Sequence, residues 1–447
     1  MPRFSHLFLL LTGLMLVSCG DDSDREQSCA ELVNANQCSV ASQNQCVHQL
    51  MQRNYLWYEQ LPQDIDYDDF VSPQETLDFL RYGDPGPDRF SYVTTAEAFD
   101  ALFAEGQYIG FGFSYISDSA GRLWVRFVYA DSPAGSAGMR RGDEILEING
   151  RDVASLTAEP GWQAVLGGDE VGYPLTMSIR HADLQEVEFD MQKAVVNINT
   201  VLHSSVIEVA GENTGYLVFS SFLNTSKTEL AQVFDEFHAA GASRVILDLR
   251  YNGGGSVEVS RLLASYLRPG RSGNEVFNRL QFNDQNRSED TSLYLSDGID
   301  GLSLDRVVVI TSSQTCSASE MVINGLKPYL DVRTLGSTTC GKPVGMRSYF
   351  FCDAALVPVT FRIENSQGLG DYFEGLDADC PLVDNEGSFV DDYTYPFGAT
   401  DAPVLQQALG YAATGECPAQ RPAHSSKGRR ALPRLFDNQL EALIGAV

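Results

Sequence analysis

Residues 244–255 read Arg-Val-Ile-Leu-Asp-Leu-Arg-Tyr-Asn-Gly-Gly-Gly, an apolar run that leads directly into a glycine-rich loop. Such a run is typical of a buried β-strand. Outward from it, strand-like segments at 215–219 and 306–311 alternate with helical spacing at 226–240 and 256–267. This alternation predicts an α/β domain whose largely parallel sheet is covered by helices.

Functional sites in such sheets lie at the carboxyl ends of the strands. The glycine loop 253–255 and the stretch 315–320, Thr-Cys-Ser-Ala-Ser-Glu, each follow a predicted strand, so we expect them to meet. The second stretch allows two interpretations. Ser317 and Glu320 fit a capping box, which satisfies N–H groups at a helix start without any chemistry. Alternatively, Ser317 is a nucleophile and Lys342, one of only five lysines, is its base.

The second interpretation has definite chemical requirements. A serine hydroxyl needs a base to remove its proton, and a lysine can serve if burial lowers its pKa. Negative charge that develops on the substrate carbonyl needs N–H donors. The glycine loop, with Gly254, and the N–H of Ala318 at the helix start are the candidates for this oxyanion hole.

Composition narrows the class of protein. A chain of 447 residues predicts two or three domains, and 43% apolar residues supply a large core. The net charge of −29 argues against a nucleic-acid partner, because phosphates require a basic surface. The cysteine spacing shows no C-x-x-C pair and the chain has no H-E-x-x-H motif, so we expect neither a metal nor another cofactor.

The N-terminus reads as a targeting segment. Arg3 precedes an apolar run of signal-peptide length, and Leu16-Val17-Ser18-Cys19-Gly20 resembles a bacterial lipobox. We therefore expect a signal peptide at 1–18, lipidation of Cys19 and a polar tether at 19–27. The alternative is an ordinary secretory signal with a chance cysteine. The lipoprotein interpretation places the chain in the bacterial cell envelope, facing the periplasm, with inner and outer membrane left open.

Eight cysteines remain after Cys19, and an even number in an exported protein indicates disulfides. Eight cysteines allow 105 connectivities. Proximity in sequence favours Cys316 with Cys340 and Cys352 with Cys380. For the first pair, two buried free thiols are the alternative.

Residues 105–195 resemble a PDZ domain. The resemblance rests on Gly110-Phe111-Gly112-Phe113 and on Gly142-Asp-Glu-Ile-Leu-Glu-Ile-Asn-Gly150. The first stretch is similar to the family's carboxylate-binding loop, in which glycines let backbone N–H groups crowd around a terminal carboxylate. The resemblance implies a β-sandwich or barrel that binds peptide carboxyl termini.

The order of the motifs over residues 105–400 resembles the carboxy-terminal processing peptidases of family S41. The resemblance implies a peptidase domain of the ClpP/crotonase type, with Ser317 as nucleophile and Lys342, 25 positions on, as base. It assigns the oxyanion hole to Gly254 and Ala318. Members with a Ser-Lys-Gln triad carry the glutamine four residues after the lysine, where this chain has Met346.

These observations predict a multi-domain α/β protein. The expected divisions are a helical region at 28–104, the PDZ domain, a peptidase domain at 196–418 and a basic tail at 419–447. The predicted function is a serine endopeptidase that cuts exported proteins or peptides near their C-termini. The alternatives are an inactive PDZ-containing adaptor lipoprotein and a Ser-Lys amidase or esterase. A Ser-His scheme through His203 or His238 is disfavoured by their positions in the pattern.

Overall fold

The computed structural model describes residues 28–417 except 84–85, 119, 157–162, 271–272, 303, 305 and 385–386. The predicted signal peptide, Cys19, the tether and the tail at 419–447 lie outside these residues. None of the helices in the described part is both long and apolar enough to cross a membrane.

The peptidase domain is built on a six-stranded sheet with the order β10-β11-β12-β15-β16-β21. Its strands are β10 (Val201–Val209), β11 (Glu212–Phe219), β12 (Arg244–Asp248), β15 (Arg306–Thr311), β16 (Asp331–Gly336) and β21 (Cys380–Pro381). The β10–β11 hairpin is antiparallel and every other neighbouring pair is parallel. The predicted α/β domain with a largely parallel sheet is confirmed.

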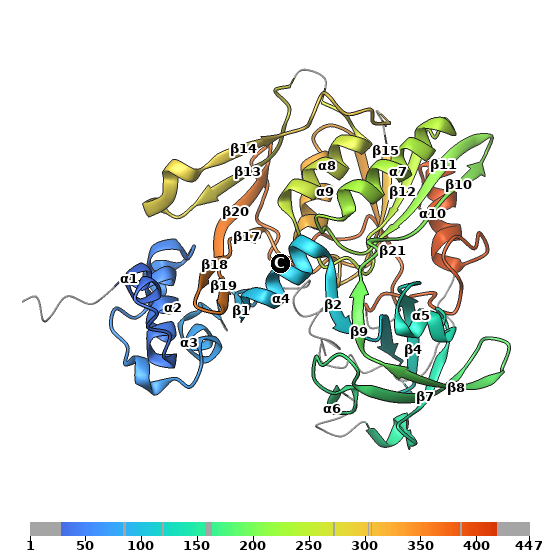
Figure 1. Cartoon of the computed structure of the whole chain (residues 1–447). Helices are drawn as coiled ribbons and strands as arrows, with labels where there is room; N and C mark the ends of the chain where they lie inside the picture. The colour runs from blue at the N-terminus through green and yellow to red at the C-terminus, as the bar shows by residue number, and fades with distance from the viewer. Residues whose placement is uncertain are drawn as a thin grey trace, which may run out of the picture.

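Helices cover both faces of this sheet because the side chains that its strands project from each face are apolar. One face packs against α7 (Ser226–Ala239), α8 (Val257–Leu267) and α9 (Ala318–Leu326), and the other packs against α10 (Pro403–Thr414). Leu247 of β12 points to the first group and its neighbour Ile246 to α10, as the two-residue period of a strand requires. Figure 1 shows α7, α8 and α9 together on one side and α10 on the other.

A second, four-stranded antiparallel sheet packs beside α9. Its order is β14-β13-β20-β17. Its strands are β13 (Val276–Phe282), β14 (Thr291–Tyr294), β17 (Val344–Met346) and β20 (Val359–Asn365), and a 3-10 turn, η6 (Asp284–Glu289), joins β13 to β14. Phe277 and Phe361 of this sheet belong to the same buried cluster as α9. The sheet thereby fixes the segment that carries Lys342 against the helix that follows Ser317.

The PDZ domain is an antiparallel sheet with the order β3-β4-β5-β7-β8. Its elements are β3 (Phe113–Ser117), β4 (Leu123–Val128), α5 (Pro133–Ala137), β5 (Glu144–Ile148), β6 (Arg151–Asp152), η5 (Val153–Leu156), α6 (Gln163–Leu166), β7 (Pro174–Arg180) and β8 (Glu186–Gln192). A separate pair, β2 (Gln107–Gly110) with β9 (Ala194–Asn197), lies between this sheet and the peptidase domain (Figure 1). Within this sheet β3 is an edge strand, and its first three residues are buried.

The N-terminal unit is helical. It contains α1 (Cys29–Asn34), α2 (Val40–Asn54), η2 (Tyr58–Gln60), η3 (Tyr67–Asp69) and α3 (Pro73–Leu80), and then β1 (Tyr92–Thr95), α4 (Ala96–Asp100) and the π-helical turn η4 (Ala101–Glu105). Ser72 accepts the N–H of Glu75 and precedes Pro73, a cap followed by proline that is typical of a helix start.

This unit docks on the peptidase domain through a three-stranded sheet, β1-β19-β18. Strands β18 (Tyr349–Phe351) and β19 (Ala354–Val357) follow closely after Lys342 in the chain. Met51 and Leu77 of the helices share one buried cluster with Val344 and Phe351. The helical unit and the lysine segment therefore pack as one body.

Four disulfides are present within the described residues: Cys29–Cys46, Cys38–Cys352, Cys316–Cys340 and Cys380–Cys417. The structure has the expected Cys316–Cys340 bond, but the expected Cys352–Cys380 pairing is wrong. Cys352 bonds Cys38, 314 residues away, because the N-terminal helices pack against β18. Sequence proximity gave no indication of this contact.

We expect the double variant Cys38→Ser, Cys352→Ser to unfold at a lower urea concentration than the wild type. Loss of a cross-link that closes so long a loop costs about 2–4 kcal/mol of unfolding free energy. The measurement is equilibrium unfolding by circular dichroism. Cys29→Ser, Cys46→Ser is the comparison: this bond closes a loop of only 17 residues, so its removal is expected to lower the midpoint by a smaller amount. An unchanged midpoint in the first variant would show that packing alone holds the N-terminal unit in place.

Candidate active site

Ser317 has a backbone conformation that an ordinary helix cap does not need. It stands between β15 and α9, is buried, and has φ 52° and ψ −112°. The caps Ser72 and Ser256 of this chain instead have extended backbones, as is usual for that position. A positive φ at a non-glycine residue is strained, and such residues cluster at functional sites. The conformation thus favours a nucleophile over a cap alone.

Glu320 connects the backbone of Ser317 with that of the lysine segment. Its Oε2 accepts the N–H groups of Ser317 and Lys342, each at 2.9 Å. Its Oε1 accepts the N–H of Gly341 at 2.9 Å and the hydroxyl of Thr339 at 2.5 Å. Burial raises the pKa of the Glu320 carboxyl above its ordinary value, although these four hydrogen bonds act in the opposite direction. One fully buried side chain therefore holds both loops.

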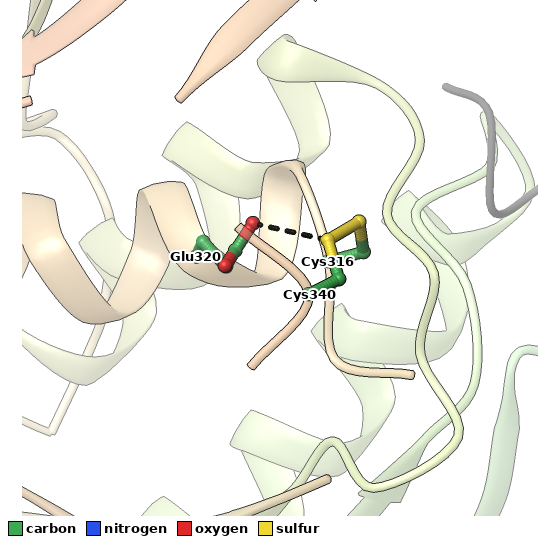
Figure 2. A group of neighbouring side chains, drawn as sticks. All are labelled: Cys316, Glu320 and Cys340. Carbon is green, nitrogen blue, oxygen red and sulfur yellow. Dashed lines mark hydrogen bonds between the residues drawn. A yellow bond between two sulfur atoms is a disulfide. The ribbon is translucent and has the colours of Figure 1, made fainter. Parts of the chain in front are cut away.

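The Cys316–Cys340 disulfide makes a second connection between the same two loops. Figure 2 shows it beside Glu320, whose Oε2 lies 3.5 Å from the Cys340 sulfur. These three residues form a cluster that resembles a metal site by proximity. The sulfurs are bonded to each other and so do not offer the thiolates that a metal binds, and the carboxylate oxygens are occupied by their four donors. The cluster has a structural role: it connects the Ser317 loop to the segment that carries Lys342.

Lys342 is completely buried in the peptidase domain. Its Nζ lies 3.1 Å from the Met346 sulfur and 5.0 Å from the centre of the Phe90 ring. Burial lowers the pKa of the amine well below its ordinary value, while the carboxylates of Asp88 and Glu320 partly offset the effect. A neutral amine can accept a proton, so the geometry suits a general base.

Two neighbours of this lysine come from the N-terminal unit. Phe90 forms a wall beside the amine, and the guanidinium of Arg89 donates to the carbonyls of Cys340 at 2.6 Å and Gly341 at 3.2 Å. Arg89 and Phe90 lie 253 and 252 positions before the lysine, and no local pattern in the sequence indicates the contact.

The glycine loop after β12 touches the Ser317 loop, as expected. The carbonyl of Asn252 accepts the N–H of Cys316 and the hydroxyl of Ser319, both at 3.1 Å. Gly254 has φ 116°, a conformation that favours glycine. Its N–H donates to the Asn252 side chain at 2.9 Å, so it does not point into an open oxyanion hole in this conformation. Ala318 opens α9, where N–H groups have no partner within the helix.

A network of buried ion pairs lies beside the glycine loop and holds the residues that precede it. Arg250, 1% exposed, binds Asp248 at 2.7 Å and Asp392 at 2.6 Å. Asp248 is the last residue of β12. Breaking a buried pair of this kind is costly because the remaining charge is left unpaired. Asp248 and Arg250 therefore shape the loop rather than react with substrate.

The cavity beside the two loops has a volume of about 430 Å³. Ser313 and Cys340 contribute to its wall from the nucleophile and lysine loops, and Arg89 contributes from the N-terminal unit. Phe373 and Phe389 add apolar surface. Neither Ser317 nor Lys342 is among its lining residues, so the cavity adjoins the two loops without opening onto the two side chains.

The predicted PDZ loop runs from the end of β2 to the start of β3. Gly112 has φ 86°, and a Cβ there would lie 2.0 Å from the Ser132 Cβ, so only glycine fits. Phe111 and Phe113 are buried in the PDZ core. The structure places Gly110–Phe113 apart from Ser317, but Arg126 of β4 donates to Gln314 at 2.7 Å, three residues before the serine.

The two histidines considered as alternative bases have other partners. His203 lies in β10 and hydrogen-bonds Ser205 at 3.1 Å, and His238 lies on α7, 3.3 Å from Asp300. Neither contact involves the Ser317 loop, which supports the choice of Lys342.

We expect Glu320→Gln to reduce kcat at least tenfold, because the amide presents N–H donors to the N–H groups that the carboxylate now accepts. Loss of hydrogen bonds to a charged group also costs about 1.5–3 kcal/mol each. Glu229→Gln is the matched control: Glu229 is likewise a carboxylate whose pKa burial raises, and it accepts N–H and hydroxyl donors from Val201 and Thr200. Equal loss of kcat in both variants, at equal folded fraction, would limit Glu320 to a stabilising role.

Comparisons with known proteins match three separate segments of the chain. Residues 213–379 match peptidase family S41, residues 42–92 match the peptidase S41 N-terminal domain, and residues 124–169 match the PDZ domain. A candidate CtpA-like serine protease of Staphylococcus epidermidis is 24% identical over 366 residues, which are 80% of this chain and 69% of that protein. The carboxy-terminal processing protease CtpA of Bacillus subtilis is 23% identical over 266 residues, 59% of this chain and 53% of that protein.

Among solved structures, a candidate S41 protease from Bacteroides fragilis superposes with a TM-score of 0.67 at 24% identity. The match covers 81% of this chain and 95% of that one, so the two share a fold. The chain therefore contains a peptidase family S41 domain, an S41 N-terminal domain and a PDZ domain, and it is a serine-type peptidase.

Proposed function

We propose that the protein is an endopeptidase in which Ser317 is the nucleophile and Lys342 the general base, acting on exported proteins or peptides near their C-termini. The observation that carries the proposal is the bridge through Glu320. One buried carboxylate binds the N–H groups of both residues, and this brings a strained serine and a buried lysine to the same place.

The chemistry is acyl transfer. The neutral amine of Lys342 takes the proton of the Ser317 hydroxyl as the oxygen attacks the substrate carbonyl. The N–H of Ala318 and the glycine loop stabilise the oxyanion, after the Gly254 N–H has left the Asn252 side chain. The lysine ammonium then protonates the leaving amine, and water releases the acyl group from the serine.

The PDZ domain has a suitable surface for substrate termini. As the edge strand of its sheet, β3 is the candidate for pairing with an extended peptide, and the loop Gly110–Phe113 at its start supplies backbone N–H groups for a terminal carboxylate. The hydrogen bond from Arg126 to Gln314 connects this sheet directly to the loop that carries Ser317. We propose that the domain recruits C-termini or gates the site.

The cellular location is part of the same proposal. A lipid attached to Cys19 anchors the protein to a membrane of the bacterial cell envelope, and the folded part faces the periplasm. The four disulfides within residues 29–417 support an oxidising compartment.

One observation favours the adaptor as a second candidate function. The Gly254 N–H is bound to Asn252, so the oxyanion hole is incomplete in this conformation. A protein that kept this arrangement would bind C-termini through its PDZ domain without cutting them.

We expect Ser317→Ala and Lys342→Ala each to lower proteolysis of an unfolded protein by at least about 10³-fold, since the two side chains act as one unit. Lys327→Ala, an exposed lysine at the end of α9, is the control and keeps full activity. In the wild type, kcat/KM rises with pH through a pKa well below the 10.5 of free lysine, because burial favours the neutral base. Activity that survives in both active-site variants would exclude the dyad.

A second prediction concerns the PDZ loop. A peptide with a free C-terminus should bind the Ser317→Ala protein at least about tenfold more tightly than the same peptide with an amidated C-terminus, because amidation removes the charged carboxylate to which the N–H groups donate. Fluorescence anisotropy gives both dissociation constants. Equal constants would show that the loop does not read the carboxylate.

A further inference from the structure

A methionine thioether faces the base of the proposed dyad. Met346 is the last residue of β17, and its sulfur lies 3.1 Å from Lys342 Nζ. A methionine is ordinarily a filler of apolar space, but its sulfur is also a weak hydrogen-bond acceptor. At this distance the amine donates to it.

The backbone is shaped to bring that sulfur to the lysine. Gly345 pairs with Phe361 of β20, whereas Met346 pairs with Val359, so the register shifts between these two residues. Irregularities of this kind bend a strand and re-aim a side chain, and they are frequent beside active sites. The local bend therefore separates Met346 from the regular alternation of β17.

The charges around the amine come from two other elements. Asp88 and Arg89 belong to the N-terminal unit, and Glu320 belongs to α9. The carboxylates favour the ammonium form, while Arg89 and burial oppose it. The Met346 thioether, 3.1 Å from Nζ, stabilises an ammonium less than an oxygen acceptor at that position would, because sulfur is a weak acceptor.

A neutral amine has two N–H groups and one lone pair. If one N–H is fixed on an acceptor, the direction of the lone pair is restricted. We propose that Met346 is the positioning residue of the base: its thioether accepts an N–H of the Lys342 amine and turns the lone pair toward Ser317. This inference rests on the Ser317–Lys342 chemistry proposed above.

The test is a series of variants at position 346 in the full-length protein. Each variant is assayed for kcat, KM and the pH dependence of kcat/KM. Met346→Leu keeps the volume and removes the acceptor. We expect kcat to fall about tenfold with KM unchanged, which corresponds to about 1.4 kcal/mol in the barrier. The acidic limb of the profile moves to lower pH, since the ammonium has lost a partner.

Met346→Gln and Met346→Glu provide progressively stronger acceptors. Gln retains kcat within about threefold of the wild type at the plateau, because an oriented acceptor is restored. The acidic limb moves to higher pH in Gln and further in Glu, since a nearby carboxylate favours the charged lysine. A merely structural role for Met346 would not produce this order of pH shifts.

Met191→Leu is the matched control, because this methionine is buried in the PDZ core and belongs to another domain. Its profile should coincide with that of the wild type. Coincident profiles for the Leu, Gln and Glu variants at position 346, with Ser317→Ala and Lys342→Ala inactive, would overturn the inference alone. Activity that persists in Ser317→Ala and Lys342→Ala would instead overturn the proposed dyad.

Discussion

The buried carboxylate of Glu320 is the interaction on which the arrangement of the two catalytic loops depends. A carboxylate without partners is very costly in a protein interior. Here its oxygens receive donors from Ser317 on one loop and from Thr339, Gly341 and Lys342 on the other. Displacing either loop would leave the charge without its donors, so the two loops are stable only together. The Cys316–Cys340 bond reinforces the same connection covalently.

The environment of the lysine is assembled from three separate parts of the chain. The peptidase sheet and α9 bring Glu320, the bent strand β17 brings Met346, and the N-terminal unit brings Phe90. Burial is the dominant influence on the amine, and it requires all three parts to be in place. The N-terminal unit, although remote in sequence, therefore forms part of the environment that sets the pKa of the lysine.

Much of the fold could be predicted from the sequence because local patterns of apolar and capping residues determine where its strands and helices form. The strand at 306–311 and the helix that begins at Pro73 follow directly from apolar periodicity and capping residues. The spacing of Ser317 and Glu320 indicated the capping interaction between them. It did not indicate that the same carboxylate also accepts hydrogen bonds from residues 339–342. Contacts such as Phe90 with Lys342 and Cys38 with Cys352 depend on how distant segments pack, and this leaves no local signal.

The Cys38–Cys352 bond has a consequence for the order in which the protein matures. A ribosome makes residue 38 early, but its partner emerges only after the nucleophile and the base have both been synthesised. The N-terminal helices can be locked in place only then, and with them Phe90 beside the amine. An unfinished or truncated chain that ends before residue 352 would carry the serine and the lysine without that lock. Phe90 is thus covalently secured beside the amine only in a chain that already contains both proposed catalytic residues and Cys352.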